Sequence, residues 1–192
     1  HTIKKFLNDV TCGQVVLVVN ELEIETMQQL LSDAGVKNPR IEIVSGGSER
    51  QYSVYHGLQV VREEVVLVHD GARPFVTQQM ISECFELAKK GHPSIVAVPV
   101  KDTMKRVVNG VVVETPNRDE MYSVQTPQAA PTELLKKAHE AAKKTHFLGT
   151  DEASLIEKYT DIPVCVVKGA YTNIKLTTPE DLLMAEQLLV AE

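Results

Sequence analysis

Residues 65–74, VVLVHDGARP, combine a short apolar run with a polar end, and the rest of the fold can be worked out from them. The run 65–68 is apolar on both faces, which is typical of a strand buried in a parallel sheet with helices above and below. His69 and Asp70 follow directly, so they would lie at the carboxyl end of the strand, where open α/β sheets bind ligands. The stretch therefore predicts a buried strand with a binding site at its end, although an ordinary Asp-Gly turn has the same local pattern.

Two side chains after this strand have the chemistry of a phosphate and metal site. The Asp70 carboxylate offers the hard oxygen ligands that Mg²⁺ prefers. Arg73 offers a planar guanidinium that can hold a phosphate through two hydrogen bonds. Gly71 and Ala72, which lie between them, are small enough to let another group approach the backbone. The residues alone leave open whether Arg73 pairs with a carboxylate instead.

The composition is typical of a globular protein and argues against nucleic-acid and membrane partners. The 192 residues include 20 Lys and Arg against 26 Asp and Glu, a net charge of −6, and are 43% hydrophobic. An acidic chain without a basic tract is a poor partner for a nucleic-acid backbone, and no apolar run approaches membrane-spanning length. The cysteines are widely spaced, as is usual in a reducing compartment. We therefore expect a cytoplasmic protein with one domain over 1–192.

Apolar runs and helical patterns alternate along the chain. Besides 65–68, the candidate strands are 14–20, 41–44, 94–99, 164–167 and 172–177. The candidate helices are 2–9, 21–34, 51–61, 77–90, 131–144, 150–158 and a last helix that opens at 178. This succession predicts an α/β fold with a doubly wound, mostly parallel sheet of the Rossmann-like kind. Gly46-Gly47, between a strand and a helix, could point backbone N–H groups at an anion, although a glycine pair more often marks a turn.

The segment 101–120 departs from this alternation. Asn109-Gly110 lies between two β-rich segments, which is the strongest short signal for a hairpin. The valines of this hairpin would be costly to leave in water, so we expect a partner to cover them. The segment is predicted to be a β-arm inserted in the domain, either a lid or a dimerisation arm.

Six blocks of sequence occur in order along the chain. They are GGSERQYSV at 46–54, HDGARPF at 69–75, PVKDTMKRV at 99–107, NRDEMYSVQTPQ at 117–128, GTDEASLIE at 149–157 and YTNIKLTTPEDL at 171–182. Together they resemble the 2-C-methyl-D-erythritol 4-phosphate cytidylyltransferases, and the resemblance spans essentially the whole chain. It implies an enzyme of the non-mevalonate isoprenoid pathway that transfers CMP from CTP to a methyl-branched polyol phosphate. Pyrophosphate leaves, and Mg²⁺ or another divalent cation assists.

The resemblance also implies roles for individual residues. The implied nucleotide-binding residues are Gly46, Gly47, Ser48, Arg50, Ser53, Asp70, Ala72 and Arg73, and Asp70 would also hold the metal. The implied residues for the polyol phosphate are Thr103, Arg118, Thr126, Thr150 and Lys175, with Lys175 and Arg118 as catalytic cations. Thr103 and Arg118 would reach the substrate of the neighbouring subunit, which implies a homodimer formed through the 101–120 arm. Nucleotidyl transfer depends mainly on charge and alignment, so cations around the phosphorus suit it.

One part of the family pattern is missing from this sequence. The family carries near its start a strand and a glycine-rich loop with an arginine and a lysine that cradle the triphosphate. We therefore expect about one βα unit, roughly 30 residues, ahead of His1, and the domain over 1–192 to be incomplete at its N-terminus. If the protein truly started at His1, a non-catalytic nucleotide-binding module would be the alternative.

Two other enzymes share this architecture. A ribitol 5-phosphate cytidylyltransferase has the same fold and chemistry, and we favour the methylerythritol substrate because Lys105 and Arg106 complete the DTMKR block. A sugar-nucleotide glycosyltransferase usually needs a metal-binding Asp-x-Asp after the central strand. Here Asp70 is followed by Gly71 and Ala72, so this alternative ranks last.

Overall fold

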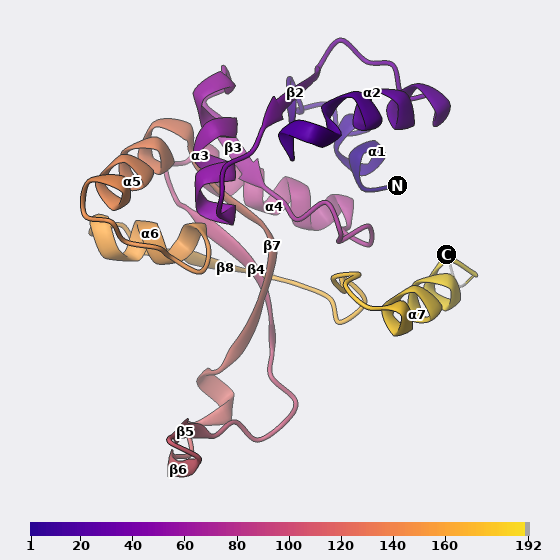
Figure 1. The fold of residues 1–192 in the computed structure, drawn as a ribbon. Coiled ribbons are helices and arrows are strands. Elements are labelled where there is room, and N and C mark those ends of the chain that lie inside the picture. The colour runs from indigo at the N-terminus through magenta and orange to yellow at the C-terminus, as the bar shows by residue number, and fades with distance from the viewer. Residues whose placement is uncertain (191–192) are drawn as a thin grey trace.

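The computed structural model describes residues 1–190, and it shows helices on both faces of a central sheet (Figure 1). The strand order of this sheet is β3-β7-β4-β8. Its strands are β3 (Val65–Val68), β4 (Ser94–Pro99), β7 (Tyr122–Pro131) and β8 (Cys165–Lys168). β4 and β8 run parallel, whereas β7 is antiparallel to both of its neighbours. The predicted α/β class is confirmed, with β7 as the antiparallel member of the central sheet.

A second, parallel pair of strands lies beside the central sheet. In it β1 (Val15–Val19) pairs with β2 (Ile41–Ser45) along its whole length. The short helix α1 (Thr2–Leu7) precedes the pair, and the 3₁₀ turn η1 (Glu21–Glu23) and α2 (Ile24–Asp33) connect its two strands. A helical crossover of this kind is what two parallel strands require.

Two apolar clusters lie on opposite faces of the central sheet. The helices that cover these faces are α3 (Arg50–Val60), α4 (Gln78–Lys89), α5 (Thr132–Lys144) and α6 (Glu152–Tyr159). α4 packs on one face, and α3, α5 and α6 pack on the other. Successive residues of a strand point to opposite faces, and Ala129 and Ala130 of β7 accordingly belong to different clusters. β3 is therefore covered on both faces, as its apolar run predicted, although each of its four residues is only partly buried.

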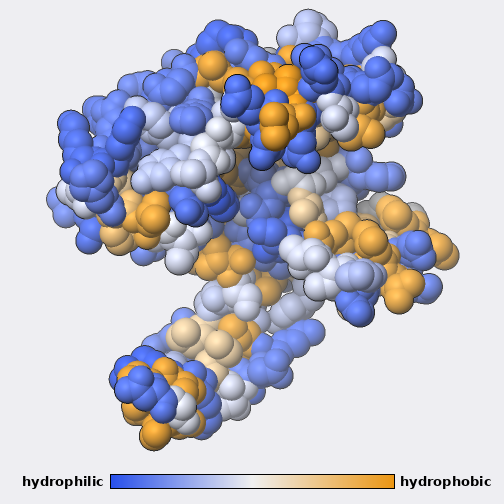
Figure 2. Space-filling model, viewed as in Figure 1, coloured by the Kyte–Doolittle hydropathy of each residue, from blue (hydrophilic) through white to orange (hydrophobic). Residues whose placement is uncertain are grey.

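The predicted hairpin is present and projects from the body of the protein (Figure 1). β5 (Arg106–Val108) and β6 (Val111–Glu114) pair antiparallel around Asn109 and Gly110. Both turn residues have positive φ, 49° and 78°, as a two-residue turn of the hairpin type needs. Residues 101–115 are all exposed, and the arm shows apolar side chains on its surface at the bottom of the view (Figure 2). The 3₁₀ turn η2 (Arg118–Glu120) leads from the arm into β7.

One predicted strand is wrong. Residues 172–177 form no strand, because their backbone bonds go to turns and not to a sheet edge. The N–H of Leu176 donates to the carbonyl of Ala72 at 2.8 Å, and the N–H of Asn173 donates to that of Ala170 at 3.0 Å. The last helix, α7 (Pro179–Val190), opens after residue 178 as predicted. No helix within residues 1–190 is both long and apolar enough to cross a membrane.

Candidate active site

Three cationic side chains from separate segments converge on the carboxylate of Asp70, which follows β3. The ammonium of Lys175 is nearest, with Nζ 3.0 Å from Oδ2. The Nε of Arg73 lies 3.7 Å from the same oxygen, and the Nε of Arg50 lies 3.7 Å from Oδ1. A chain with a net charge of −6 thus gathers positive charge at the carboxyl end of β3. Such a focus of charge suits a small anionic ligand.

Hydrogen bonds to backbone carbonyls hold the segments of this cluster together. The N–H of Arg73 donates to the carbonyl of Asp70 at 2.9 Å, which closes a four-residue turn after β3. The guanidinium Nη1 of Arg73 donates to the carbonyl of Asn173 at 2.7 Å. Together with the bond from Leu176 to Ala72, this contact fixes the extended segment that carries Lys175 against the turn. The structure therefore brings Asp70, Ala72, Arg73 and Lys175 together, as the sequence predicted.

The cluster sets the ionisation of its own carboxylate. Burial alone would raise the pKa of Asp70, but the hydrogen bond and charge of Lys175, with the charges of Arg50 and Arg73, outweigh burial and hold that pKa below its usual value. Burial lowers the pKa of Arg73, and the charge of Asp70 opposes this effect. Arginine stays protonated in proteins in spite of such shifts. The site at neutral pH is thus a carboxylate surrounded by cations.

Arg50 is held by Glu152, a residue that the sequence reasoning missed. Nη1 and Nη2 of Arg50 donate to Oε1 and Oε2 of Glu152 at 2.8 and 2.9 Å. The Glu152 side chain is 3% exposed, and burial raises its pKa while the Arg50 hydrogen bonds oppose the rise. The bidentate contact joins the start of α3 to the start of α6, so only the Nε side of Arg50 faces Asp70. The available signal was an acidic residue in the first turn of the predicted helix at 150–158. Direct contact between Arg50 and a nucleotide stays a prediction.

The glycine pair after β2 forms a tight loop with small walls. A Cβ atom added at Gly47 would lie 2.5 Å from the Cβ of Tyr52, and one added at Gly46 would lie 2.8 Å from the Oγ of Ser53. The N–H of Gly47 donates to the Oγ of Ser53 at 3.1 Å, so Ser53 braces the loop from α3. Ser48 is exposed beside it. The loop lies at the amino end of α3, where backbone N–H groups favour an anion.

Thr126 and His69 lie against the turn that carries Asp70. The Thr126 side chain is buried, and its hydroxyl oxygen accepts the N–H of Asp70 at 3.1 Å. The same oxygen lies 2.9 Å from Nδ1 of His69. Burial lowers the pKa of His69 to about 4, so the ring is neutral at pH 7. Thr126 is expected from the sequence to bind the substrate, but its hydroxyl already has protein partners. We therefore expect Thr126 to act through Asp70.

Three other residues expected to bind the polyol phosphate, Thr103, Arg118 and Thr150, lie outside the Asp70 cluster. Thr103 and Arg118 are exposed, and Nη1 of Arg118 donates to the carbonyl of Lys101 at 3.2 Å. Both belong to the arm, which points away from the sheet (Figure 1). Thr150 is exposed and precedes Asp151, the residue that caps α6. Their contact with a substrate, from the same or a neighbouring subunit, stays a prediction.

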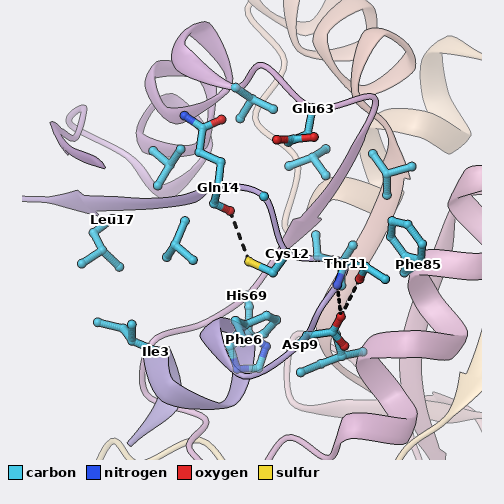
Figure 3. Close-up of a pocket in the computed structure, with 18 of the residues that line it drawn as sticks. Ile3, Phe6, Asp9, Thr11, Cys12, Gln14, Leu17, Glu63, His69 and Phe85 are labelled. Atoms are coloured by element: carbon cyan, nitrogen blue, oxygen red, sulfur yellow. Dashed lines mark hydrogen bonds between the residues drawn. The ribbon is translucent and has the colours of Figure 1, made fainter. Parts of the chain in front are cut away.

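A cavity of about 860 Å³ lies between the two sheets (Figure 3). Its walls include β1, β3 and the rings of Phe6 and Phe85. Within residues 1–190, β1 pairs only with β2 and β3 pairs only with β7, so one edge of each of these strands has no partner strand. Of the HDGARPF block, His69 and Gly71 line the cavity. Walls that are mostly apolar are poorly suited to a phosphate, so the Asp70 cluster is the better candidate for phosphate chemistry.

Comparisons with known proteins match the whole chain. A family model described as IspD, 2-C-methyl-D-erythritol 4-phosphate cytidylyltransferase, matches residues 1–191. The protein of that name from Bacillus velezensis is 50% identical over 193 residues, which cover 100% of this chain and 83% of the relative. The one from Halalkalibacterium halodurans is 50% identical over 190 residues, which cover 98% and 82%.

Solved structures give the same result. The crystal structure of 4-diphosphocytidyl-2C-methyl-D-erythritol synthase from Anaerococcus prevotii has a TM-score of 0.89 at 32% identity, covering 98% of this chain and 83% of that one. The 2-C-methyl-D-erythritol 4-phosphate cytidylyltransferase from Francisella tularensis has a TM-score of 0.81 at 31% identity, covering 97% and 85%. The likeness therefore extends over both the sequence and the fold.

Proposed function

Because the chain belongs to the family of 2-C-methyl-D-erythritol 4-phosphate cytidylyltransferases, we propose that its reaction takes place at the Asp70 cluster. The enzyme transfers CMP from CTP to 2-C-methyl-D-erythritol 4-phosphate, and it forms 4-diphosphocytidyl-2-C-methyl-D-erythritol and pyrophosphate for isoprenoid biosynthesis. The observation that supports this location is the convergence of Arg50, Arg73 and Lys175 on one carboxylate. The names of the relatives favour methylerythritol over the ribitol substrate that the sequence left open.

The reaction joins two anions, and this determines what the site must supply. A phosphate oxygen of the polyol phosphate forms a bond to the α-phosphorus of CTP while the bond from that phosphorus to the pyrophosphate oxygen breaks. Cations on both sides of the phosphorus reduce the repulsion and hold the attacking and leaving oxygens in line. The side chain of Lys175 is 45% exposed, so it can turn from Asp70 to a bound phosphate. Arg73 is held more firmly, and it can stabilise charge on the nucleotide.

We propose that Asp70 is the protein ligand of the Mg²⁺ ion that nucleotidyl transfer uses. Within residues 1–190, no group of three or more His, Cys, Asp or Glu side chains gathers into a metal site. One carboxylate fits Mg²⁺ nevertheless, because this ion is often held by one or two carboxylates together with substrate phosphates. When bound, the ion would neutralise charge on the phosphates.

Removal of the metal tests this proposal. We expect activity to be lost in excess EDTA and to return with Mg²⁺, and Asp70→Asn to raise the Mg²⁺ concentration that gives half the maximal rate. An undiminished rate in EDTA, or an unchanged Mg²⁺ requirement in Asp70→Asn, would contradict the role of Asp70 as a ligand.

We propose that the arm forms a homodimer and carries Thr103 and Arg118 to the neighbouring site. Five valines on the arm, at 107, 108 and 111–113, are between 46% and 64% exposed. Exposed apolar side chains gathered on one short hairpin usually mark an interaction site. A second copy of the arm would cover it and would bring a cation toward the neighbour's Asp70 cluster.

Mixed dimers test whether the site is shared between subunits. Arg118→Ala and Lys175→Ala subunits are each expected to be nearly inactive alone. In a heterodimer of the two, one site would combine the intact Lys175 of one chain with the intact Arg118 of the other. Equal mixing should restore about one quarter of the wild-type rate, since half of the dimers are mixed and each has one complete site. Recovery no greater than the sum of the separate variants would show that each site is built within one chain.

We infer a cytoplasmic location from the cysteines. Cys12, Cys84 and Cys165 are free thiols. Burial raises the pKa of Cys84 to about 11 and also raises that of Cys12, so both thiols are protonated and poorly reactive. Thiol titration of the protein from its native cells should find all three reduced, and a disulfide would contradict the inference.

The function itself is tested by a direct comparison of substrates. Pyrophosphate release is measured with CTP and either 2-C-methyl-D-erythritol 4-phosphate or ribitol 5-phosphate. We expect efficient turnover only with the first. Faster turnover of ribitol 5-phosphate would overturn the substrate assignment, and no turnover with either would overturn the enzyme activity.

A further inference from the structure

A chain of hydrogen bonds connects the two ends of the Asp70 turn through side chains that the reaction does not otherwise use. We propose that His69 is a positioning residue, which acts through Thr126 to fix the turn 70–73 and so places the Asp70 carboxylate and the Arg73 guanidinium. The inference rests on the proposed role of the Asp70 cluster in the reaction.

The contacts of His69 show which of its two ring nitrogens carries the hydrogen. Nε2 lies 3.0 Å from the carbonyl oxygen of Arg73. A carbonyl oxygen can only accept, so Nε2 must carry the hydrogen and donate it. In a neutral ring Nδ1 is then the acceptor, and the hydrogen it accepts comes from the Thr126 hydroxyl at 2.9 Å.

Thr126 passes this constraint to Asp70. Its hydroxyl donates its one hydrogen to His69, so its oxygen is oriented to accept the N–H of Asp70 at 3.1 Å. The sequence of donors is therefore Asp70 N–H to Thr126, Thr126 O–H to His69, and His69 Nε2–H to the carbonyl of Arg73. Both ends of the turn are tied, the first through its N–H and the last through its carbonyl. A hydrogen-bonded chain in which each member has one permitted direction defines a single arrangement.

Packing keeps the imidazole in place. The ring of Phe6 lies against the ring of His69, with centroids 4.9 Å apart, on the wall of the cavity between the sheets (Figure 3). The other partner, Thr126, is buried on β7 next to β3. The imidazole therefore links the apolar interior to the charged end of β3. Without the imidazole, the turn that carries Asp70 would lose the hydrogen bonds that fix the position of its carboxylate.

Paired substitutions measure this effect. His69→Phe keeps a planar ring and removes the hydrogen bonds to Thr126 and to the Arg73 carbonyl, whereas Thr126→Val removes the hydrogen bonds to Asp70 and to His69. We expect each to lower kcat by about tenfold or more, because small misplacements of catalytic groups have large effects on rate. The KM for CTP should change less than kcat, because Asp70 and Arg73 are displaced but the glycine loop after β2 is untouched. If the residues act as one unit, the double variant should be no slower than the slower single variant.

Two controls separate positioning from loss of fold. His139→Leu removes another buried imidazole, on α5, and should leave kcat unchanged even where it lowers the melting temperature. His69→Gln places an amide N–H near the Arg73 carbonyl and is expected to recover part of the rate that His69→Phe loses. A kcat within about twofold of wild type in both His69→Phe and Thr126→Val, or effects that simply multiply in the double variant, would overturn the proposal.

A spectroscopic measurement on the unmodified enzyme does not depend on folding of the variants or on the assigned reaction. Nitrogen NMR shifts of isotope-labelled histidine distinguish the two neutral tautomers. We expect His69 to carry its hydrogen on Nε2, and a hydrogen on Nδ1 would overturn the proposal. Inactivity of the wild-type enzyme with CTP and 2-C-methyl-D-erythritol 4-phosphate would instead count against the proposed function, and the tautomer would still be measured.

Discussion

Replacing Glu152 with glutamine should destabilise the protein and weaken CTP binding together, because one buried carboxylate holds Arg50 in place. Glu152 is 3% exposed, and its two oxygens accept both terminal nitrogens of the Arg50 guanidinium at 2.8 and 2.9 Å. Glutamine keeps the shape and accepts one of these hydrogen bonds. Its NH₂ group, however, would face the second guanidinium nitrogen as a donor against a donor.

The magnitude follows from the burial of the pair. Removing one partner of a fully buried ion pair costs about 3–5 kcal/mol, because the remaining charge is left uncompensated. The Arg50 side chain is 39% exposed, so water can partly replace the lost partner. We therefore expect Glu152→Gln to lower the free energy of unfolding by about 2–3 kcal/mol. The KM for CTP should rise as well, because Arg50 lies at the start of α3 beside the glycine loop.

Urea unfolding of four proteins measures the pair: the wild type, Glu152→Gln, Arg50→Met and the double variant. Arg50→Met should be strongly destabilising too, because it leaves the Glu152 carboxylate buried without a cation. The double variant should lose about 1–3 kcal/mol less stability than the sum of the two single losses, because it contains neither the Arg50 guanidinium nor the Glu152 carboxylate and so leaves no unpaired charge. Additive losses, or a loss below about 0.5 kcal/mol in Glu152→Gln, would refute this reasoning.

Three further predictions concern other parts of the chain. Burial lowers the pKa of His139 to about 4, so as the pH falls below about 6.5 the unfolded chain binds a proton on this histidine before the folded protein does. The free energy of unfolding should therefore drop by about 3 kcal/mol between neutral pH and pH 4. Urea titrations should show a smaller loss of stability at acid pH in His139→Leu than in the wild type, and an equal loss would contradict this origin. Gly47→Ala should raise the KM for CTP about tenfold with a smaller change in kcat, because the added Cβ would lie 2.5 Å from the Cβ of Tyr52; an unchanged KM would remove the loop from the nucleotide site. Val112→Asp should shift the protein from dimer to monomer in sedimentation, because it places a charge on an apolar surface proposed to be covered; an unchanged dimer would exclude that surface.

The elements of this fold could be predicted because their signals are local. The apolar run at 65–68 is a strand covered on both faces, and Asn109-Gly110 forms the hairpin turn with two positive φ angles. The segment 172–177 shows the limit of such signals. Its side-chain pattern suits a strand, but a strand also needs a free sheet edge, and this segment contacts the turn after β3 instead.

The candidate site could be predicted only where side chains act near their own strand or loop. Asp70 and Arg73 are three residues apart and meet as expected. Glu152 lies 102 residues from Arg50, and no local pattern reports which cation a buried carboxylate will meet. The contacts of Thr126 with His69 and Asp70 were missed for the same reason, since these partners follow the neighbouring strand β3.

The kcat/KM of Lys175→Met for 2-C-methyl-D-erythritol 4-phosphate tests the central claim most directly, with Lys144→Met as a matched control on the exposed surface of α5. The claim is that the cations around Asp70 act on the phosphate groups of the reaction. It predicts a fall on the order of 10²-fold or more for Lys175→Met, about 3 kcal/mol of lost transition-state stabilisation, in a protein that still melts cooperatively. Lys144→Met should match the wild type. A Lys175→Met enzyme within about threefold of the wild type would contradict the claim.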